Sequence, residues 1–253
     1  MKKLVPLIVG NWKNFVLGPK EALALVKGID KGLPRTLSCN LVICPPTSVL
    51  AYVRSSYSGK RMQIGAQNVS EFVDGVHTGE VSASMVRAAG ATYAIVGHAE
   101  RRAMGETDAV VALKVRAVLD AKMTPVVCIG ESLRDKEGHH FTAIEQMLKG
   151  SLATVLPNEI SKIVIAYEPV WAIGAATAPD ARTVAEAILF IRKSLVQVFG
   201  RDGALRVKVL YGGAVDEESA AGLLRQGQAS GFLVGRASAD AARFVATIRA
   251  CQA

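Results

Sequence analysis

The chain has 253 residues, half of them hydrophobic and only 6% aromatic, and it carries a formal net charge of +8. So much apolar surface excludes a disordered chain, and the length suits one (β/α)8 barrel. The basic charge attracts small anions and nucleic acid alike, but the Lys and Arg residues are scattered along expected helices without a nucleic-acid-binding module, so we expect a small anionic substrate and no nucleic-acid partner.

The amino terminus, MKKLVPLIVG, combines two lysines with an apolar run, as a signal peptide does. The run is too short, lacks a small-residue cleavage site and leads directly into Asn11-Trp12-Lys13, so we predict a first buried strand. No segment approaches the ~20 apolar residues of a membrane span, and we expect no membrane association. Cys44 and Cys128 lie in strand-like apolar runs, which favours reduced core thiols and a cytoplasmic location.

Short apolar runs alternate along the chain with segments of helical period. Runs that are apolar throughout are typical of parallel strands buried on both faces. Eight such units in about 250 residues favour a closed α/β barrel over an open sheet. We therefore predict a single domain over residues 1–253, with strands at 5–9, 41–44, 62–66, 93–96, 125–129, 163–167, 207–211 and 232–234.

Local signals support the helical segments between these runs. Pro19 precedes a predicted helix over 21–29, and Pro179-Asp180 opens a long helix over 181–198. Both prolines suit the first turn of a helix, where no backbone N–H is needed. The last helical segment is expected over 239–250.

Every predicted strand ends in residues that are unusual for a buried strand. In a parallel barrel all the carboxyl ends open on one face, where active sites are built. Lys13, His98 and Glu168 are thereby expected at one mouth, although they come from distant parts of the chain. The eight strand ends are Asn11-Trp12-Lys13, Pro45-Pro46, Gln67-Asn68, Gly97-His98, Gly130-Glu131, Glu168-Pro169, Gly212-Gly213 and Gly235-Arg236.

These side chains suit a proton shift beside a carbonyl group. Glu168 would be the base, because desolvation at a strand end raises the proton affinity of a carboxylate. His98 would polarise the carbonyl, and Lys13 would add fixed positive charge. Taken singly, the same residues also fit a salt-bridge partner, a structural histidine and a surface lysine; their convergence favours catalysis. The glycine-rich ends of the last two strands would offer backbone N–H groups to a phosphate.

Motifs along nearly the whole chain resemble those of the triosephosphate isomerase family, which folds as a TIM barrel, and they occur in the family's order. The segment 167–174 is highly specific, whereas the Asn-Trp-Lys and Gly-His elements are weaker by themselves. The motifs are Gly10-Asn11-Trp12-Lys13, Gly65-Ala66-Gln67-Asn68, Thr78-Gly79-Glu80-Val81-Ser82, Gly97-His98 with Glu100-Arg101-Arg102, Cys128-Ile129-Gly130-Glu131, and Tyr167-Glu168-Pro169-Val170-Trp171-Ala172-Ile173-Gly174.

The resemblance implies interconversion of dihydroxyacetone phosphate and D-glyceraldehyde 3-phosphate, a reaction of glycolysis and gluconeogenesis. Glu168 would move the proton through an enediol(ate), neutral His98 would polarise the carbonyl, and Lys13 and Asn11 would contact substrate oxygens. No metal or organic cofactor is implied.

The resemblance also implies a phosphate site, a mobile lid and a homodimer. Ala214, Gly235 and Arg236 would meet the phosphate, and Gly174 would lie at the tip of a lid that begins after Glu168. The loop 68–78 resembles the family's interface loop, so that Thr78 would approach the partner's site in a C2 dimer. The alternative is an ordinary surface loop.

Two departures from the family pattern concern the base and the lid. Ala99 stands where the family usually has a serine whose hydroxyl holds the resting base, so Glu168 is expected to rest differently. The lid is about two residues shorter than usual, which we expect to alter its opening.

Two further departures concern the phosphate. Ala214 replaces a serine, which removes one hydroxyl but leaves a backbone N–H. Arg236 replaces a glycine, and three outcomes stay open: the guanidinium contacts the phosphate, it points to solvent or pairs with an acidic neighbour, or it distorts the site if that position needs a positive φ.

Three other functions remain as alternatives. An isomerase of a four-carbon sugar phosphate would use the same proton chemistry. A non-catalytic relative acting as a binding protein has no physical need for Lys13, His98 and Glu168 together. A nucleic-acid-binding protein would show strongly salt-dependent binding.

Overall fold

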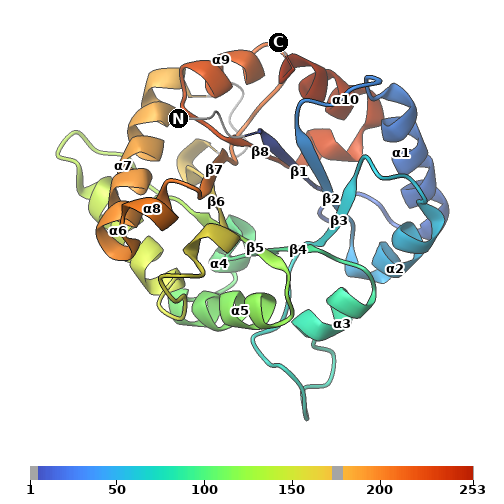
Figure 1. Cartoon of the computed structure of the whole chain (residues 1–253), viewed down its shortest axis with the longest axis horizontal. Coiled ribbons are helices and arrows are strands. Elements are labelled where there is room, and N and C mark those ends of the chain that lie inside the picture. Colours follow the sequence, from blue (N-terminus) through green and yellow to red (C-terminus); the bar gives the residue numbers. More distant parts are fainter. Residues whose placement is uncertain (1–4, 173–178, 253) are drawn as a thin grey trace.

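The computed structural model describes residues 5–172 and 179–252, and its centre is a closed barrel of parallel strands ringed by helices (Figure 1). Each strand pairs with the next in sequence, and the eighth pairs with the first. The predicted (β/α)8 barrel is therefore confirmed. The strands are β1 (Leu7–Asn11), β2 (Asn40–Cys44), β3 (Gln63–Ala66), β4 (Tyr93–Val96), β5 (Thr124–Ile129), β6 (Val164–Tyr167), β7 (Lys208–Tyr211) and β8 (Gly231–Val234).

Helices connect the strands and cover the outside of the barrel (Figure 1). The α-helices are α1 (Pro19–Gly32), α2 (Thr47–Ser56), α3 (Ala83–Ala88), α4 (Ala99–Ala103), α5 (Asp108–Asp120), α6 (His139–Ser151), α7 (Ala181–Phe199), α8 (Arg201–Ala204), α9 (Ala220–Arg225) and α10 (Ala241–Ala250), with 3-10 turns η1 (Ile160–Lys162), η2 (Val170–Ala172) and η3 (Arg236–Ala239). Within the described residues, every helix is too short or too polar to cross a membrane.

The predicted strands match the observed ones to within two residues at each end. The largest difference is at the first strand, which begins at Leu7, while Val5 is 51% exposed. Pro6 explains the shift, because it has no N–H to donate to a neighbouring strand. The Pro6 carbonyl accepts the Asn40 N–H at 2.8 Å, but donation from this strand starts at the next residue, where the Leu7 N–H donates to the Ser230 carbonyl at 3.0 Å.

Side chains from alternate strand residues form two apolar layers. One layer fills the barrel interior and includes both Cys44 and Cys128, as expected for core thiols. The other packs between the strands and the helices, and Ile8 and Ile43 belong to it. Strands buried on both sides explain why the sequence shows continuous apolar runs rather than alternation.

The observed helix starts follow the local signals. Pro19 opens α1, whose apolar face, formed by Ala22, Leu25, Val26 and Ile29, is buried. Asp180 caps α7 by accepting the Thr183 N–H at 2.9 Å, and that helix ends one residue beyond its predicted limit. The last helix is shorter than expected, because residues 236–239 form the separate turn η3.

Candidate active site

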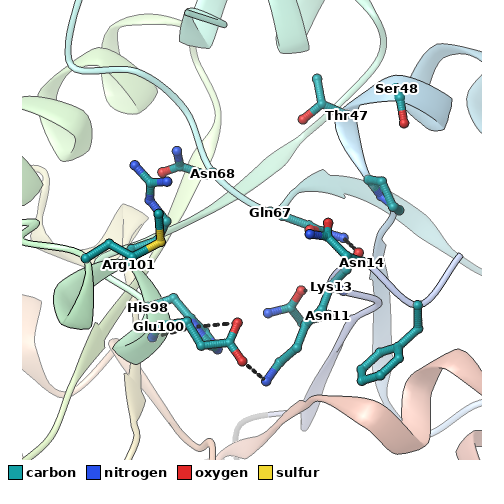
Figure 2. A pocket seen from close by; sticks show the side chains of 13 residues that line it. Asn11, Lys13, Asn14, Thr47, Ser48, Gln67, Asn68, His98, Glu100 and Arg101 are labelled. Carbon is teal, nitrogen blue, oxygen red and sulfur yellow. Dashed lines mark hydrogen bonds and ion pairs between the residues drawn. The ribbon is translucent and has the colours of Figure 1, made fainter. Parts of the chain in front are cut away.

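A cavity of about 700 Å³ opens where β1 to β4 end. Figure 2 shows Lys13 and Asn11 facing Glu100 and His98, with Thr47 and Ser48 on the far side of the cavity. The mouth thus collects polar side chains on an apolar barrel. Its lining comprises Asn11, Lys13, Asn14, Phe15, Pro46, Thr47, Ser48, Gln67, Asn68, His98, Glu100, Arg101 and Met104.

Glu168 follows the last residue of β6, is only 2% exposed and is held at both carboxylate oxygens. Its Oε2 accepts the backbone N–H of Ala99 at 3.0 Å, and its Oε1 lies 3.2 Å from His98 Nε2. A side-chain hydroxyl at position 99 is therefore not needed to hold the resting carboxylate. The first backbone N–H of α4 does this, where the positive end of the helix also favours a negative charge.

Two glycines leave space for Glu168. A Cβ at Gly130 would lie 1.9 Å from the Glu168 carbonyl oxygen, and one at Gly212 would lie 2.8 Å from its Cγ. The neighbouring Cys128 adds no charge here. Burial, and next the negative charge of Glu168, raise the pKa of the Cys128 thiol well above its ordinary value. The base thus sits among glycines and a neutral thiol.

His98 is positioned by its own place at the start of α4. It is the N-cap residue, and its Nδ1 accepts the Glu100 N–H at 3.2 Å. An imidazole nitrogen that accepts a hydrogen bond carries no proton, so the ring proton is on Nε2. The other ring nitrogen, Nε2, is then the one that faces the base, 3.2 Å from Glu168 Oε1.

Lys13 has a strained backbone, with φ at 48°. A positive φ is uncommon outside glycine and is held here by several hydrogen bonds. The Lys13 N–H donates to Asn11 Oδ1 at 3.1 Å, and the Gln67 amide donates to the Lys13 carbonyl at 2.8 Å. The Lys13 Nζ lies 2.5 Å from Glu100 Oε1, so its ammonium is fixed at the mouth of the cavity.

Glu131 anchors the segment that follows Glu168. Its Oε1 accepts the Tyr167 hydroxyl at 2.9 Å and the Trp171 indole N–H at 2.8 Å. Its carbonyl accepts the Val170 N–H at 3.0 Å. Burial and the Glu131 charge together raise the pKa of Tyr167, which keeps its hydroxyl a donor. Gly174, the expected tip of the lid, lies outside the described residues, as does the shortened stretch after it.

The expected phosphate residues follow β7 and β8. Gly235 lies beside Lys13, because a Cβ built on it would be 3.7 Å from Lys13 Nζ. The backbone N–H groups of Ala214, Gly235 and Arg236 have no hydrogen-bond acceptor within the described part of the chain. Three backbone donors that follow β7 and β8 are therefore open to a ligand, and Gly235 is the one shown beside Lys13.

The structure decides two of the questions raised by Arg236. The residue does not have a positive φ, so it does not strain the turn. It takes part in none of the ion pairs formed by residues 5–172 and 179–252, so the alternative of pairing with an acidic neighbour is not seen there. Its guanidinium carbon instead lies 5.6 Å from the centroid of the Phe15 ring.

Thr78 is exposed and stands apart from the site of its own chain. It lies on the loop between β3 and α3, which protrudes from the outline of the barrel (Figure 1). Phe72 and His77 stack within this loop at 3.6 Å between ring centroids, while Val73 and Val76 are 62% and 99% exposed. The loop therefore presents an ordered apolar tip to its surroundings.

Several contacts at the site were not anticipated from the sequence. Glu100 stood out in the sequence only as part of a motif, although its side chain pairs with Lys13. Glu131 stood out only as the residue at a strand end. Phe15 gave no signal, because its partner Arg236 lies near the other end of the chain. Away from this mouth, Asp135 and Glu137 on the loop after β5 and His139 at the start of α6 bring ligand-type atoms within 4.8 Å of one another; the last two are exposed.

Three comparisons relate this geometry to known proteins. The model of the family described as triosephosphate isomerase matches residues 6–251. Proteins named triosephosphate isomerase from Endomicrobium trichonymphae and Mycobacterium avium are 38% and 40% identical, over 96% and 98% of this chain and 98% and 97% of theirs. A crystal structure of triosephosphate isomerase from Bartonella henselae has a TM-score of 0.86 and 33% identity, covering 99% of this chain and 100% of that one.

Proposed function

The chain belongs to the triosephosphate isomerase family and interconverts dihydroxyacetone phosphate and D-glyceraldehyde 3-phosphate, and from this premise we propose that Glu168, His98 and Lys13 carry out the reaction. The observation that carries the proposal is the 3.2 Å approach of Glu168 Oε1 to His98 Nε2. A carboxylate and an imidazole nitrogen thus meet at one point, where a substrate carbon and its carbonyl oxygen would lie.

The proton moves in two steps. The Glu168 carboxylate takes a proton from C1 of dihydroxyacetone phosphate, and the electron pair forms a C1–C2 double bond as the C2 carbonyl oxygen becomes an enediolate. The His98 Nε2–H donates to the oxygen on which charge develops, and the Lys13 ammonium stabilises that charge. His98 Nε2 gives its proton to the C2 oxygen, which becomes a hydroxyl, and takes the proton of the C1 hydroxyl in exchange. Glu168 then returns its proton to C2, and the electrons of the C1–C2 double bond and of the C1 oxygen rearrange to form the aldehyde. The reaction is a step of glycolysis.

The phosphate would bind to the open N–H groups of Ala214, Gly235 and Arg236; Gly235 lies beside Lys13, which supports this proposal. Asn11 Oδ1 is engaged by the Lys13 N–H, which leaves its amide NH₂ for a substrate oxygen. The net charge of +8 also favours binding of the substrate, because it attracts a dianion. A lid that starts after Glu168 and reaches Gly174 would exclude water from the enediolate.

Replacing the base tests the assignment. Glu168→Gln keeps the size of the side chain and removes its basicity, so we expect kcat to fall by at least about 10³-fold, since both proton transfers need the carboxylate. The assay follows both triose phosphates in both directions, and circular dichroism checks the fold. A variant with more than a tenth of the wild-type kcat would contradict the role of Glu168. Faster turnover of a four-carbon keto-sugar phosphate than of the trioses would favour the rival substrate.

We also propose a C2 homodimer in which Thr78 on the loop between β3 and α3 enters the cavity of the partner near Asn11 and Lys13. The proposal is supported by the loop's exposed apolar residues Val73 and Val76, because a monomer rarely keeps such a protruding apolar tip in water. Sedimentation at micromolar concentrations is expected to give about twice the chain mass of 26.7 kDa. A monomer of undiminished activity would refute the composite site.

A cytoplasmic location is proposed as well. It is supported by glycolytic chemistry and by the four buried, unpaired cysteines, which suit a reducing compartment. Cell fractionation with antibody detection would test it, and enrichment outside the cytoplasm would contradict it.

A further inference from the structure

Phe15 and Arg236 meet at the mouth although they lie near opposite ends of the chain. Phe15 follows β1, and Arg236 is the first residue of η3 after β8. These strands are neighbours in the closed barrel, with Gly10 paired to Val234. Closure of the barrel therefore places the two residues side by side, with the guanidinium carbon 5.6 Å from the ring centroid.

The backbone around both side chains is well held. The Phe15 N–H donates to the Trp12 carbonyl at 3.1 Å, which fixes the turn after β1. The Gly235 carbonyl accepts the Ser238 N–H at 2.8 Å and the Ser238 hydroxyl at 2.7 Å, which fixes the turn into η3. The ring and the guanidinium thus project from two rigid turns rather than from flexible loops.

The charges at this mouth differ in their pairing. Lys13 shares its charge with Glu100, and Arg101 shares its charge with Glu106. Arg236 has no carboxylate within ion-pair distance among the residues that the structure describes, and the face of Phe15 is what it contacts. A guanidinium over an aromatic face keeps its edge N–H donors open, so it can still form two parallel hydrogen bonds to an oxyanion.

We propose that Phe15 positions Arg236 as a side-chain clamp for the substrate's phosphate, so that this pair determines the preference for a phosphorylated substrate. The inference rests on the proposed function and assigns a role to a residue, Phe15, that no part of the mechanism uses. Arg236 lies next in sequence to Gly235, which borders Lys13, so the clamp adds to the open backbone donors there. The Arg236 guanidinium supplies a charged contact to the phosphate, whereas Ala214 offers only its backbone N–H.

The test compares Phe15→Leu, which removes the aromatic face, with Phe15→Trp, which keeps one. Tyr52→Leu is the matched control, because Tyr52 is a 39% exposed aromatic on α2, compared with 44% for Phe15. Two quantities are measured. One is the ratio of kcat/KM for D-glyceraldehyde 3-phosphate to that for unphosphorylated D-glyceraldehyde. The other is the calorimetric Kd for inorganic phosphate.

For Phe15→Leu we expect the ratio to fall about 3- to 10-fold through KM, and the phosphate Kd to rise by a similar factor. Phe15→Trp is expected to retain most of the preference for the phosphorylated substrate and most of the affinity for inorganic phosphate. Arg236→Gln should cause a larger fall, about 10- to 100-fold, and adding Phe15→Leu to it should cause little more, because the ring acts through the guanidinium. Sedimentation of each variant checks that the oligomeric state is kept.

Equal losses for both substrates in Phe15→Leu, or additive losses in the double variant, would overturn the clamp. An unchanged phosphate Kd would also overturn it. Phosphate binding does not depend on turnover, so a failure of the clamp is distinguishable from a failure of the proposed reaction, which Glu168→Gln tests separately.

Discussion

Ala99 offers a sharp test of how the base is held. It is the first residue of α4, and its N–H donates to Glu168 Oε2 rather than to the helix. Proline is tolerated at this helix position, and His98 before it has φ −55° and ψ 143°, which suits a residue that precedes proline. Ala99→Pro therefore keeps the helix start and removes one hydrogen bond from the carboxylate, which must also move away from the ring Cδ that replaces the amide hydrogen.

The size of the effect follows from the 3.0 Å length of this charge-assisted bond. Hydrogen bonds to charged groups contribute about 1.5–3 kcal/mol. Since a shift of one pH unit corresponds to about 1.4 kcal/mol, the acidic limb of the kcat/KM–pH profile should move up by about one to two pH units. The direction is upward, because removing a donor to the charged form favours protonation of the carboxylate.

The assay measures kcat/KM for D-glyceraldehyde 3-phosphate across the acidic range, together with the thermal midpoint. Ala181→Pro is the matched control, because Ala181 is also the first residue of a helix and follows a residue with φ −61° and ψ 154°. Both variants should keep Tm within a few degrees of the wild type. An acidic limb that stays in place in a folded Ala99→Pro variant would refute the idea that this N–H holds Glu168.

Two further predictions concern the glycine packing and a buried ion pair. Gly212→Ala places a Cβ 2.8 Å from the Glu168 Cγ, whereas ordinary contacts are 3.4 Å or longer. The base must therefore move, and kcat should fall about 10-fold. Gly222→Ala is the control, because its Cβ would have nothing within 4 Å, and kcat should stay unchanged in the same assay. Burial alone would raise the pKa of Glu106, but its hydrogen bond and ion pair with Lys114 bring that pKa below its usual 4.5. The ion pair therefore stabilises the fold above pH 4.5, and its contribution to stability is lost as the pH falls. Glu106→Gln should therefore destabilise the protein by about 3 kcal/mol at pH 7, by urea unfolding, with a smaller difference below pH 4.5; a difference independent of pH would contradict the ion pair's role.

Local patterns in the amino-acid sequence were enough to predict the barrel. Apolar runs such as 93–96 and 163–167 report burial on both faces, and Pro19 and Pro179-Asp180 report helix starts. These signals are local, because they arise from side chains a few residues apart on one element. The order of the strands then brings Lys13, His98 and Glu168 to one mouth, since all carboxyl ends of a parallel barrel share a face.

The contacts that hold these groups could be seen only in the folded barrel. The Ala99 N–H on Glu168, Glu100 on Lys13, and the ring of Phe15 on Arg236 each join residues from different strand ends. Such contacts depend on which strands are neighbours and on the side-chain directions within a few ångströms, neither of which leaves a periodic signal in the chain. Position 99 is an example. The sequence shows only that a hydroxyl is missing there, whereas the structure shows that a backbone N–H, which every amino acid except proline has, binds the base instead.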